Sequence, residues 1–392
     1  MKKLPIMIGL LFIFNLLIKG LFLNHAPNSL SFQEVEILKF IHINPSVDDF
    51  SFRLISVFIG SFIDILLFYL IYKKTNNYLV SFCVAISVGL SPWFVILSRY
   101  LNVYLIPIFL MAFIFNFFPK KIYPLLIAIL SLVVFRFFII SQDLLSIRLT
   151  LLIPDLARLF DLRTIFFQGD TSSPMLRIPL TGFFFYLDLI AFFFGIGYLF
   201  IIDKNKELKA VINQILLLGL VFFLILPADL LMTQRGELIF LWIGIINGLG
   251  YYYFFNILKN KSVFLVYIFI FALLINFLFT AELFINHFDK KNSSEWSYAE
   301  RSTIQYLVSI NKNRVYVSKS NQSDKLYRYL KFYNPKNIEY KKMEIADLKI
   351  TCQFDQVICI LNENELSEFN IEKDDSRMQF GHFDGLPIYF IL

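Results

Sequence analysis

The chain has 392 residues, of which 57% are hydrophobic and 17% are charged, and its mean hydropathy is +0.65. These values exclude an ordinary soluble domain. The formal net charge is +6, but much of the excess comes from lysines in loops between apolar stretches, so the charge does not indicate nucleic-acid binding. We therefore expect a multi-pass membrane protein that is surrounded by lipids.

Lysine clusters mark alternate ends of the apolar stretches. They fall on every second loop, as the positive-inside rule requires of cytoplasmic loops. The pattern predicts that the N-terminus lies inside, that the C-terminus lies outside and that any chemistry belongs to the outer loops. The clusters are Lys2-Lys3, Lys73-Lys74, Lys120-Lys121, Lys204/Lys206/Lys209 and Lys259/Lys261.

The stretches between the clusters predict about nine spans of a cytoplasmic (inner) membrane, because a membrane helix needs about 20 mainly apolar residues. The first stretch has no small-x-small cleavage site and is interpreted as a retained anchor. The fourth is short and holds Pro107. In chain order the predicted spans are Leu4–Leu23, Leu54–Tyr72, Tyr78–Leu97, Val103–Phe118, Ile122–Ile140, Leu180–Ile202, Ala210–Leu231, Leu238–Leu258 and Val263–Leu283.

The composition divides the chain into two domains. Residues 1–285 form the predicted transmembrane domain, with outer loops at 24–53 and 141–178. From residue 286 polar residues dominate, and apolar runs shrink to the length of strands. A smaller extracytoplasmic domain, 286–392, is therefore expected.

This smaller domain is predicted to be α/β. Arg314–Ser318 (RVYVS) and Gln356–Leu361 (QVICIL) have the composition of strands. A helix is expected near Asp324–Phe332, and the apolar periodicity that follows Ser297 predicts another helix, extending to Ile310.

The cysteines point to no metal or redox motif. Cys83 lies within a predicted span and is expected to pack as a small apolar residue. Cys352 and Cys359 lie in the predicted outer domain, where a disulfide between them is geometrically allowed. The chain contains no CxxC pair, histidine cluster, Gly-rich phosphate loop or GxSxG turn, so soluble nucleotide chemistry has no support.

Asp64, Arg136 and Asp188 are charged residues that lie inside predicted spans. A charge at that depth is costly unless it is paired or hydrated, so each is a functional candidate. The alternative is a buried ion pair between helices, formed by Arg136 with Asp64 or Asp188.

Acidic residues and arginines gather on the outer side of the predicted spans. Arginine binds phosphate oxygens through a planar fork, and a carboxylate can deprotonate an attacking hydroxyl. Ordinary solvation and snorkelling at the interface would produce the same charges. The candidate residues are Glu34, Asp48, Asp49, Arg53, Arg99, Asp170, Arg177 and Arg235.

Five phrases in chain order carry a family resemblance. They are Phe32–Val35 (FQEV), Ser51–Gly60 (SFRLISVFIG), Leu90–Arg99 (LSPWFVILSR), Thr164–Asp170 (TIFFQGD) and Glu295–Tyr298 (EWSY) before the Val315–Ser318 strand. On these phrases the chain resembles bacterial GT-C glycosyltransferases, in the branch that includes protein O-mannosyltransferases and the aminoarabinose transferases of lipid A. The resemblance covers roughly residues 5–335.

The resemblance implies a GT-C fold and transfer of a sugar from a polyprenyl-phosphate donor to an acceptor on the outer face, without a cofactor. Glu34 would be the base. The phosphate or diphosphate would meet Arg53, Arg99 and Arg235, and the acceptor or a loop would be positioned by Asp48, Asp49, Asp170 and Arg177. A divalent metal between Glu34 and Asp48 or Asp49 is the less favoured option. The resemblance does not name the sugar or the acceptor.

The chain departs from the family pattern at sensitive positions. Gln33 stands where the family has its catalytic Asp, and an amide cannot accept the proton. Asn102 or Val103 stands where a second acidic residue is expected, and several spans of larger members are missing between Ile140 and Leu180. The alternative is therefore a catalytically degenerate protein of the same fold that acts as a lipid-binding or assembly partner. A transporter is less favoured, since no repeated pair of broken helices appears.

Overall fold

The computed structural model divides the chain into two compact units. The helical unit comprises Met1–Leu23 and Arg53–Ile285, and the α/β unit comprises Asn24–Phe52 and Asn286–Leu392. The predicted first outer loop thus belongs largely to the α/β unit. The residues that the structure describes are 3–21, 34, 37–38, 49–100, 105–118, 149–169, 178, 180–202, 205–225, 235–292, 298–309, 314–319, 326–327, 329–330, 339–352, 358–362, 365, 378–381 and 387–391.

Four described helices are long and apolar enough to cross a membrane: Phe52–Thr75, Lys206–Leu224, Glu237–Lys261 and Val263–Phe288. Shorter apolar helices accompany them, so the chain is a mainly helical protein of membrane type. The predicted span at Ile122–Ile140 lies outside the described residues. The helices are α1 (Lys3–Gly20), α3 (Asp49–Thr75), α4 (Tyr78–Gly89), α5 (Pro92–Leu97), α6 (Leu105–Phe117), α8 (Leu149–Leu159), α9 (Asp188–Gly197), α10 (Lys206–Ile225), α12 (Glu237–Lys261) and α13 (Val263–Asn292), with π-helical turns at Thr164–Gln168 and Tyr198–Ile202.

Two predicted spans are interrupted in the structure. The third breaks into α4 and α5, because Pro92 has no N–H to continue the helix and stands in the first turn of α5. The sixth becomes α-helical only at Asp188. Leu180 has a positive φ of 61°, and a side chain at Gly182 would overlap the carbonyl oxygen of Ile165, so this segment turns instead of forming a helix.

Helix α12 is the core of the helical unit, buried continuously from Glu237 to Tyr251. Glycines let its neighbours approach closely. A Cβ on Gly248 would overlap the backbone of Val84 in α4, and one on Gly250 would overlap the carbonyl oxygen of Ala191 in α9. Small residues at helix contacts are typical of packing in membranes, where dispersion and close backbone approach replace the hydrophobic effect.

A glycine pair on α9 allows this packing to be tested. A Cβ on Gly195 would overlap the carbonyl oxygen of Ile246 in α12, whereas nothing lies within 4 Å of a Cβ on Gly197. We expect Gly195→Ala to destabilise the protein by about 1–3 kcal/mol, the usual cost of overpacking, and Gly197→Ala to have little effect. Thermal unfolding of the purified proteins in detergent measures both, and equal melting temperatures would contradict the packing.

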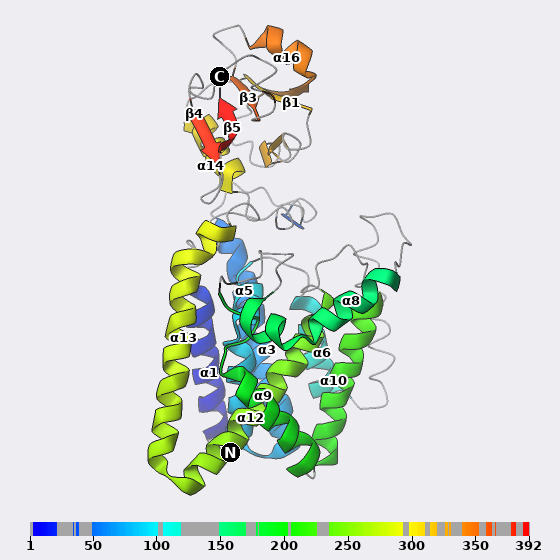
Figure 1. Cartoon of the computed structure of the whole chain (residues 1–392), viewed down its shortest axis with the longest axis vertical. Coiled ribbons are helices and arrows are strands. Elements are labelled where there is room, and N and C mark those ends of the chain that lie inside the picture. Colours follow the sequence, from blue (N-terminus) through cyan, green and yellow to red (C-terminus); the bar gives the residue numbers. More distant parts are fainter. Residues whose placement is uncertain are drawn as a thin grey trace. The chain divides into compact units, whose positions relative to one another are not determined.

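Helix α13 has the opposite environment. Only 11% of its most apolar stretch is buried, compared with 78% for α12. In Figure 1, α13 and α10 lie on opposite sides of the helical unit, with α9 and α12 between them. Exposed Phe264, Phe271 and Leu278 suit a surface that faces lipid tails.

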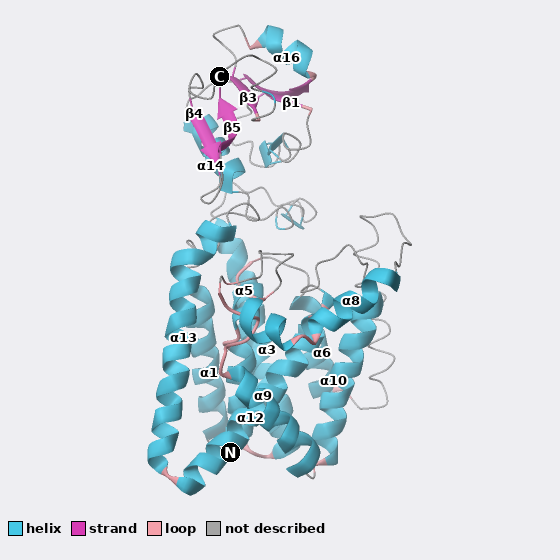
Figure 2. Cartoon of the chain, viewed as in Figure 1, coloured by secondary structure: helices cyan, strands magenta, loops and turns pink. Residues whose placement is uncertain are grey.

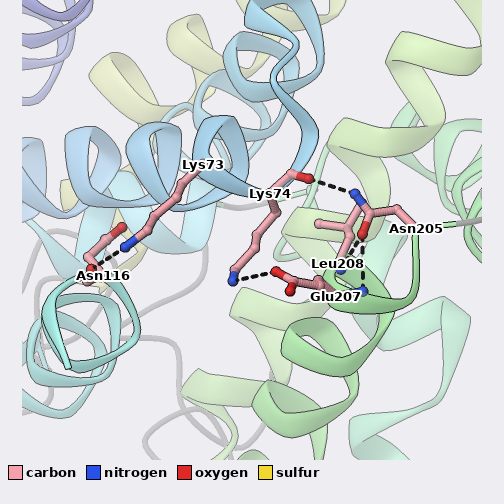
Figure 3. Close-up of polar contacts among 6 residues, drawn as sticks. All are labelled: Lys73, Lys74, Asn116, Asn205, Glu207 and Leu208. Carbon is pink, nitrogen blue, oxygen red and sulfur yellow. Dashed lines mark hydrogen bonds and ion pairs between the residues drawn. The ribbon is translucent and has the colours of Figure 1, made fainter. Parts of the chain in front are cut away.

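The lysines at the end of α3 contact the end of α6 and the start of α10 (Figure 3). Lys73 donates to the carbonyl oxygen of Asn116, at the end of α6 that precedes Lys120-Lys121 (3.1 Å). Lys74 pairs with Glu207 at the start of α10 (3.0 Å), and Asn205 donates to the Lys74 carbonyl (2.6 Å). The structure thus brings together three of the ends that the lysine pattern assigns to one side.

The α/β unit contains every described strand (Figure 2). The sheet order is β2-β1-β3-β5-β4, in which β1 pairs in parallel with β2 and β3, and β5 pairs antiparallel with β3 and β4. Val315 lies opposite Ile358, and Tyr316 lies opposite Cys359. The elements are α14 (Tyr298–Ser309), β1 (Arg314–Ser318), β2 (Glu339–Met343), α16 (Ile345–Thr351), β3 (Ile358–Leu361), β4 (Met378–Gly381) and β5 (Pro387–Ile391).

The two predicted strands are confirmed as β1 and β3, and the predicted helix after Ser297 is α14. Strand β2 (EYKKM) was not predicted, because it is polar and has no fully buried residue. Cys352 and Cys359 form a disulfide with Cα atoms 5.8 Å apart. It joins the end of α16 to β3 beside buried Leu348 and Leu361.

Candidate functional site

Three predicted phosphate contacts lie at the end of the helical unit opposite the lysines. Arg53 is in the first turns of α3, which ends at Lys73-Lys74, and Arg235 precedes α12, which ends at Lys259 and Lys261. At 1.5 Å per residue, about 20 residues separate the two ends by roughly 30 Å. Arg99 follows α5, whereas α4, the helix before α5, begins close to Lys73-Lys74. All three side chains are buried, at 1–2% exposed.

Arg99 holds the end of α1. Its Nη1 donates to the carbonyl oxygens of Lys19 (2.8 Å) and Leu21 (2.6 Å), and its guanidinium lies over the ring of Phe284 at 4.9 Å. The last carbonyl groups of a helix have no partner within the helix and carry partial negative charge. Arg99 therefore supplies to α1 a C-terminal cap from the turn that follows α5.

Arg235 performs the same task for α10 and also forms an ion pair. Its Nη2 donates to the carbonyl oxygen of Phe223 (3.0 Å), in the last turn of α10, and its guanidinium lies 4.2 Å from the centre of the Phe223 ring. The last turn of α10 has no basic residue of its own. Nη1 pairs with Asp155 of α8 (3.0 Å), whose side chain is 25% exposed. Nε is buried and has no partner among the described residues.

A buried ion pair joins α1 to α3. Lys19 Nζ binds Asp64 Oδ2 and donates to the carbonyl oxygen of Gly60 (3.1 Å), with both charged side chains fully buried. The ammonium also lies 4.3 Å from the centre of the Phe94 ring. The sequence predicts a buried pair for Asp64, and the structure supplies Lys19 as its partner; Arg136 lies outside the described residues.

Asp188 is held by a hydroxyl and an amide. Tyr251 of α12 donates to its Oδ1, and the backbone N–H of Phe185 donates to its Oδ2 (2.9 Å). Both carboxylate oxygens are therefore occupied, and Asp188 connects the start of α9 to α12. This arrangement indicates a structural role for Asp188.

The remaining predicted residues are only partly described. Glu34 is helical and fully buried, and it belongs to the α/β unit, whereas the three arginines belong to the helical unit. Asp49 begins α3, and its side chain is not described. Gln33, Asp48, Asp170 and Arg177 lie outside the described residues. Among the described residues, no three His, Cys, Asp or Glu side chains come together in a way that could hold a metal ion.

The sequence analysis missed three participants: Lys19, Asp155 and Glu237. Lys19 was overlooked because it stands near the end of a span, where lysines usually snorkel. Asp155 follows a proline within an otherwise apolar segment, so only its contact with Arg235 gives it significance. Glu237 opens α12 and is almost fully buried. A search for charges near both ends of each predicted span could have found Lys19 and Glu237, whereas Asp155 lies within the predicted outer loop 141–178.

None of the protein-family models, curated proteins or solved structures compared with this chain matches it. The function must therefore be inferred from the residues themselves.

Proposed function

We propose that this protein is a membrane glycosyltransferase of GT-C type, which moves a sugar from a polyprenyl-phosphate donor to an acceptor on the outer face of the membrane. The observation that carries the proposal is that Arg53, Arg99 and Arg235 are each buried and lie toward the ends of helices opposite the lysines. Burial strengthens the attraction between a guanidinium and a phosphate, because the surrounding dielectric is low.

The orientation we propose places the lysine end in the cytoplasm and the arginine end outside. The clustering of the lysine-bearing ends supports one common side for them, and the positive-inside rule makes that side cytoplasmic. The Cys352–Cys359 disulfide supports an oxidising location for the α/β unit. Together these features favour an inner-membrane protein whose α/β unit is extracytoplasmic.

Substituted cysteines test this orientation. Lys261, at the end of α12, and Ile350, in α16, are both exposed. In intact cells, an impermeant maleimide is expected to label Ile350→Cys at once, but Lys261→Cys only after the membrane is permeabilised. The free native thiol, Cys83, lies within a membrane helix and provides the unlabelled background. The reverse labelling pattern would overturn the orientation.

In the proposed reaction Glu34 acts as the base. It takes the proton of the acceptor hydroxyl as the acceptor oxygen bonds to the anomeric carbon of the sugar. The bond between that carbon and the phosphate oxygen breaks, and its electron pair leaves with the polyprenyl phosphate. The arginines stabilise the charge of the departing phosphate. The proton returns from Glu34 to solvent or to the phosphate.

The direct test is a transfer assay with the purified protein in lipid nanodiscs. Polyprenyl phosphates that carry radiolabelled hexoses or pentoses are supplied with envelope fractions as acceptors. Transfer of label to an acceptor, together with release of polyprenyl phosphate, is the expected result. A protein that fails to bind any of these lipids would refute the proposal.

A second candidate is a catalytically degenerate protein of the same fold, which binds the lipid or assists assembly. Gln33 in place of the family's Asp favours it. So does the engagement of Arg99 and Arg235 in capping the ends of α1 and α10, since structural contacts account for part of their burial. Binding of polyprenyl phosphate without transfer to any acceptor would favour this candidate.

A further inference from the structure

The first turn of α12 contains a buried carboxyl group with one oxygen that the described part of the chain does not satisfy. Glu237 is 4% exposed, and its Oε1 has no hydrogen-bond partner among the described residues. Asp64, also buried in this unit, pairs with Lys19 through Oδ2 although its Oδ1 has no partner among the described residues, and both oxygens of Asp188 are bound. Leaving a buried carboxyl unpaired is costly, and ionisable groups retained in membrane helices usually serve function.

Two unsatisfied donors lie next to this turn. Arg235 precedes Glu237 by two residues, and its Nε–H has no partner among the described residues. Trp93 packs on Phe240, one turn after Glu237, with ring centroids 5.7 Å apart, and its indole N–H is buried and unpartnered as well. One carboxyl acceptor and one N–H donor therefore belong to residues at the start of α12, and a second N–H donor belongs to Trp93, which packs against α12 at Phe240.

Helix packing does not explain these groups. Gly219 of α10 lies against Leu238 and Ile239, where an added Cβ would be 3.0 Å from the Ile239 nitrogen, so the neighbouring contacts are apolar and close. Arg235 reaches the partly exposed Asp155 on its other side. No hydrogen bond among the described residues thus accounts for these three polar atoms.

We propose that Glu237, Arg235 and Trp93 bind the sugar hydroxyls of the donor, beside its phosphate. This inference rests on the proposed function, and it assigns the sugar of the donor lipid to the residues at the start of α12. A sugar hydroxyl both donates and accepts hydrogen bonds, so it satisfies a carboxylate together with N–H groups. A divalent cation would instead require several oxygen ligands, and Arg235 would repel it.

The test compares two lipids that differ only in the sugar: bare polyprenyl phosphate and polyprenyl-phosphate glucose or mannose. Their binding to the full-length protein in nanodiscs is measured for wild type and for Glu237→Gln. We expect Glu237→Gln to weaken binding of the sugar-carrying lipid by about 10-fold to 100-fold, the range for a hydrogen bond to a charged group, and to leave binding of bare polyprenyl phosphate unchanged. Arg235→Lys, which loses the planar fork, should weaken both.

Glu207→Gln is the matched control. It removes a carboxylate of the same type from an exposed ion pair at the lysine end, and it should change neither affinity. Glu237→Gln should keep or raise the melting temperature, since it removes an unpaired buried acid.

Three results would each overturn the inference: equal weakening of both lipids by Glu237→Gln, no weakening of either, or loss of the fold, which would assign Glu237 a structural role. Wild-type protein that binds neither lipid would refute the proposed function itself, whereas wild-type binding of both without a Glu237→Gln effect refutes only this inference.

Discussion

Asp64→Ala alone is expected to destabilise the protein by about 3–5 kcal/mol, the cost of leaving one member of a buried ion pair without its partner. Lys19 would keep its contact with the Gly60 carbonyl but would lose the only carboxylate that the described residues give it. A fall in the melting temperature of the detergent-purified protein is the measurement.

The double variant Lys19→Met/Asp64→Leu separates burial from pairing. Replacing both charges by apolar side chains of similar size is often neutral or stabilising, so the double variant should recover most of the stability lost by Asp64→Ala. The ion pair also leaves no space for a side chain at Gly89, because a Cβ there would lie 2.8 Å from both Asp64 Oδ2 and Asn15 Oδ1. If the double variant is less stable than Asp64→Ala, the pair has a role beyond mutual neutralisation.

Glu34→Gln is expected to reduce sugar transfer by about 10²–10⁴-fold, the usual contribution of a positioned general base. Binding of polyprenyl phosphate should persist, because the arginines of the helical unit are unchanged. The transfer assay described above, run beside a lipid-binding measurement, gives both quantities.

Gln33→Asp is the companion variant, since it restores the carboxylate that the resembled family has at this position. It should raise transfer if the rest of the site is intact. Wild-type protein that binds the lipid yet transfers nothing, with Gln33→Asp equally inactive, would favour the non-enzymatic candidate over the transferase.

Hydropathy and loop lysines were sufficient to predict the long helices α3, α10, α12 and α13, because the lengths and flanks of membrane helices follow directly from the bilayer. Breaks within spans were harder to foresee. Pro92 shows one of them in the sequence, but the turns before Asp188 depend on the close approach of Gly182 to Ile165, which is a tertiary contact.

The site was predictable in its residue types but not in its pairings. Arg99 and Arg235 stood out as outer-side arginines, yet both bind backbone carbonyl groups, which every residue carries and no sequence pattern distinguishes. The carboxylate partner of Arg235, Asp155, was not singled out either. A carboxylate as deep in a membrane span as Asp64 requires a cation at the same depth to pair with it. Arg136 is the cation that the sequence suggests, whereas Lys19, near the end of the first span, is the one that binds Asp64.

The buried arginines also bear on how the chain enters the membrane. In the proposed orientation each must cross during synthesis, which the insertion machinery disfavours for any basic residue. Each nevertheless stands between two lysine clusters that stay behind: Arg53 and Arg99 on either side of Lys73-Lys74, and Arg235 between Lys209 and Lys259. The hairpins that contain these three arginines are thus each retained by at least two lysines on each flank. Removing a single cluster should leave the second flank to maintain the direction of insertion.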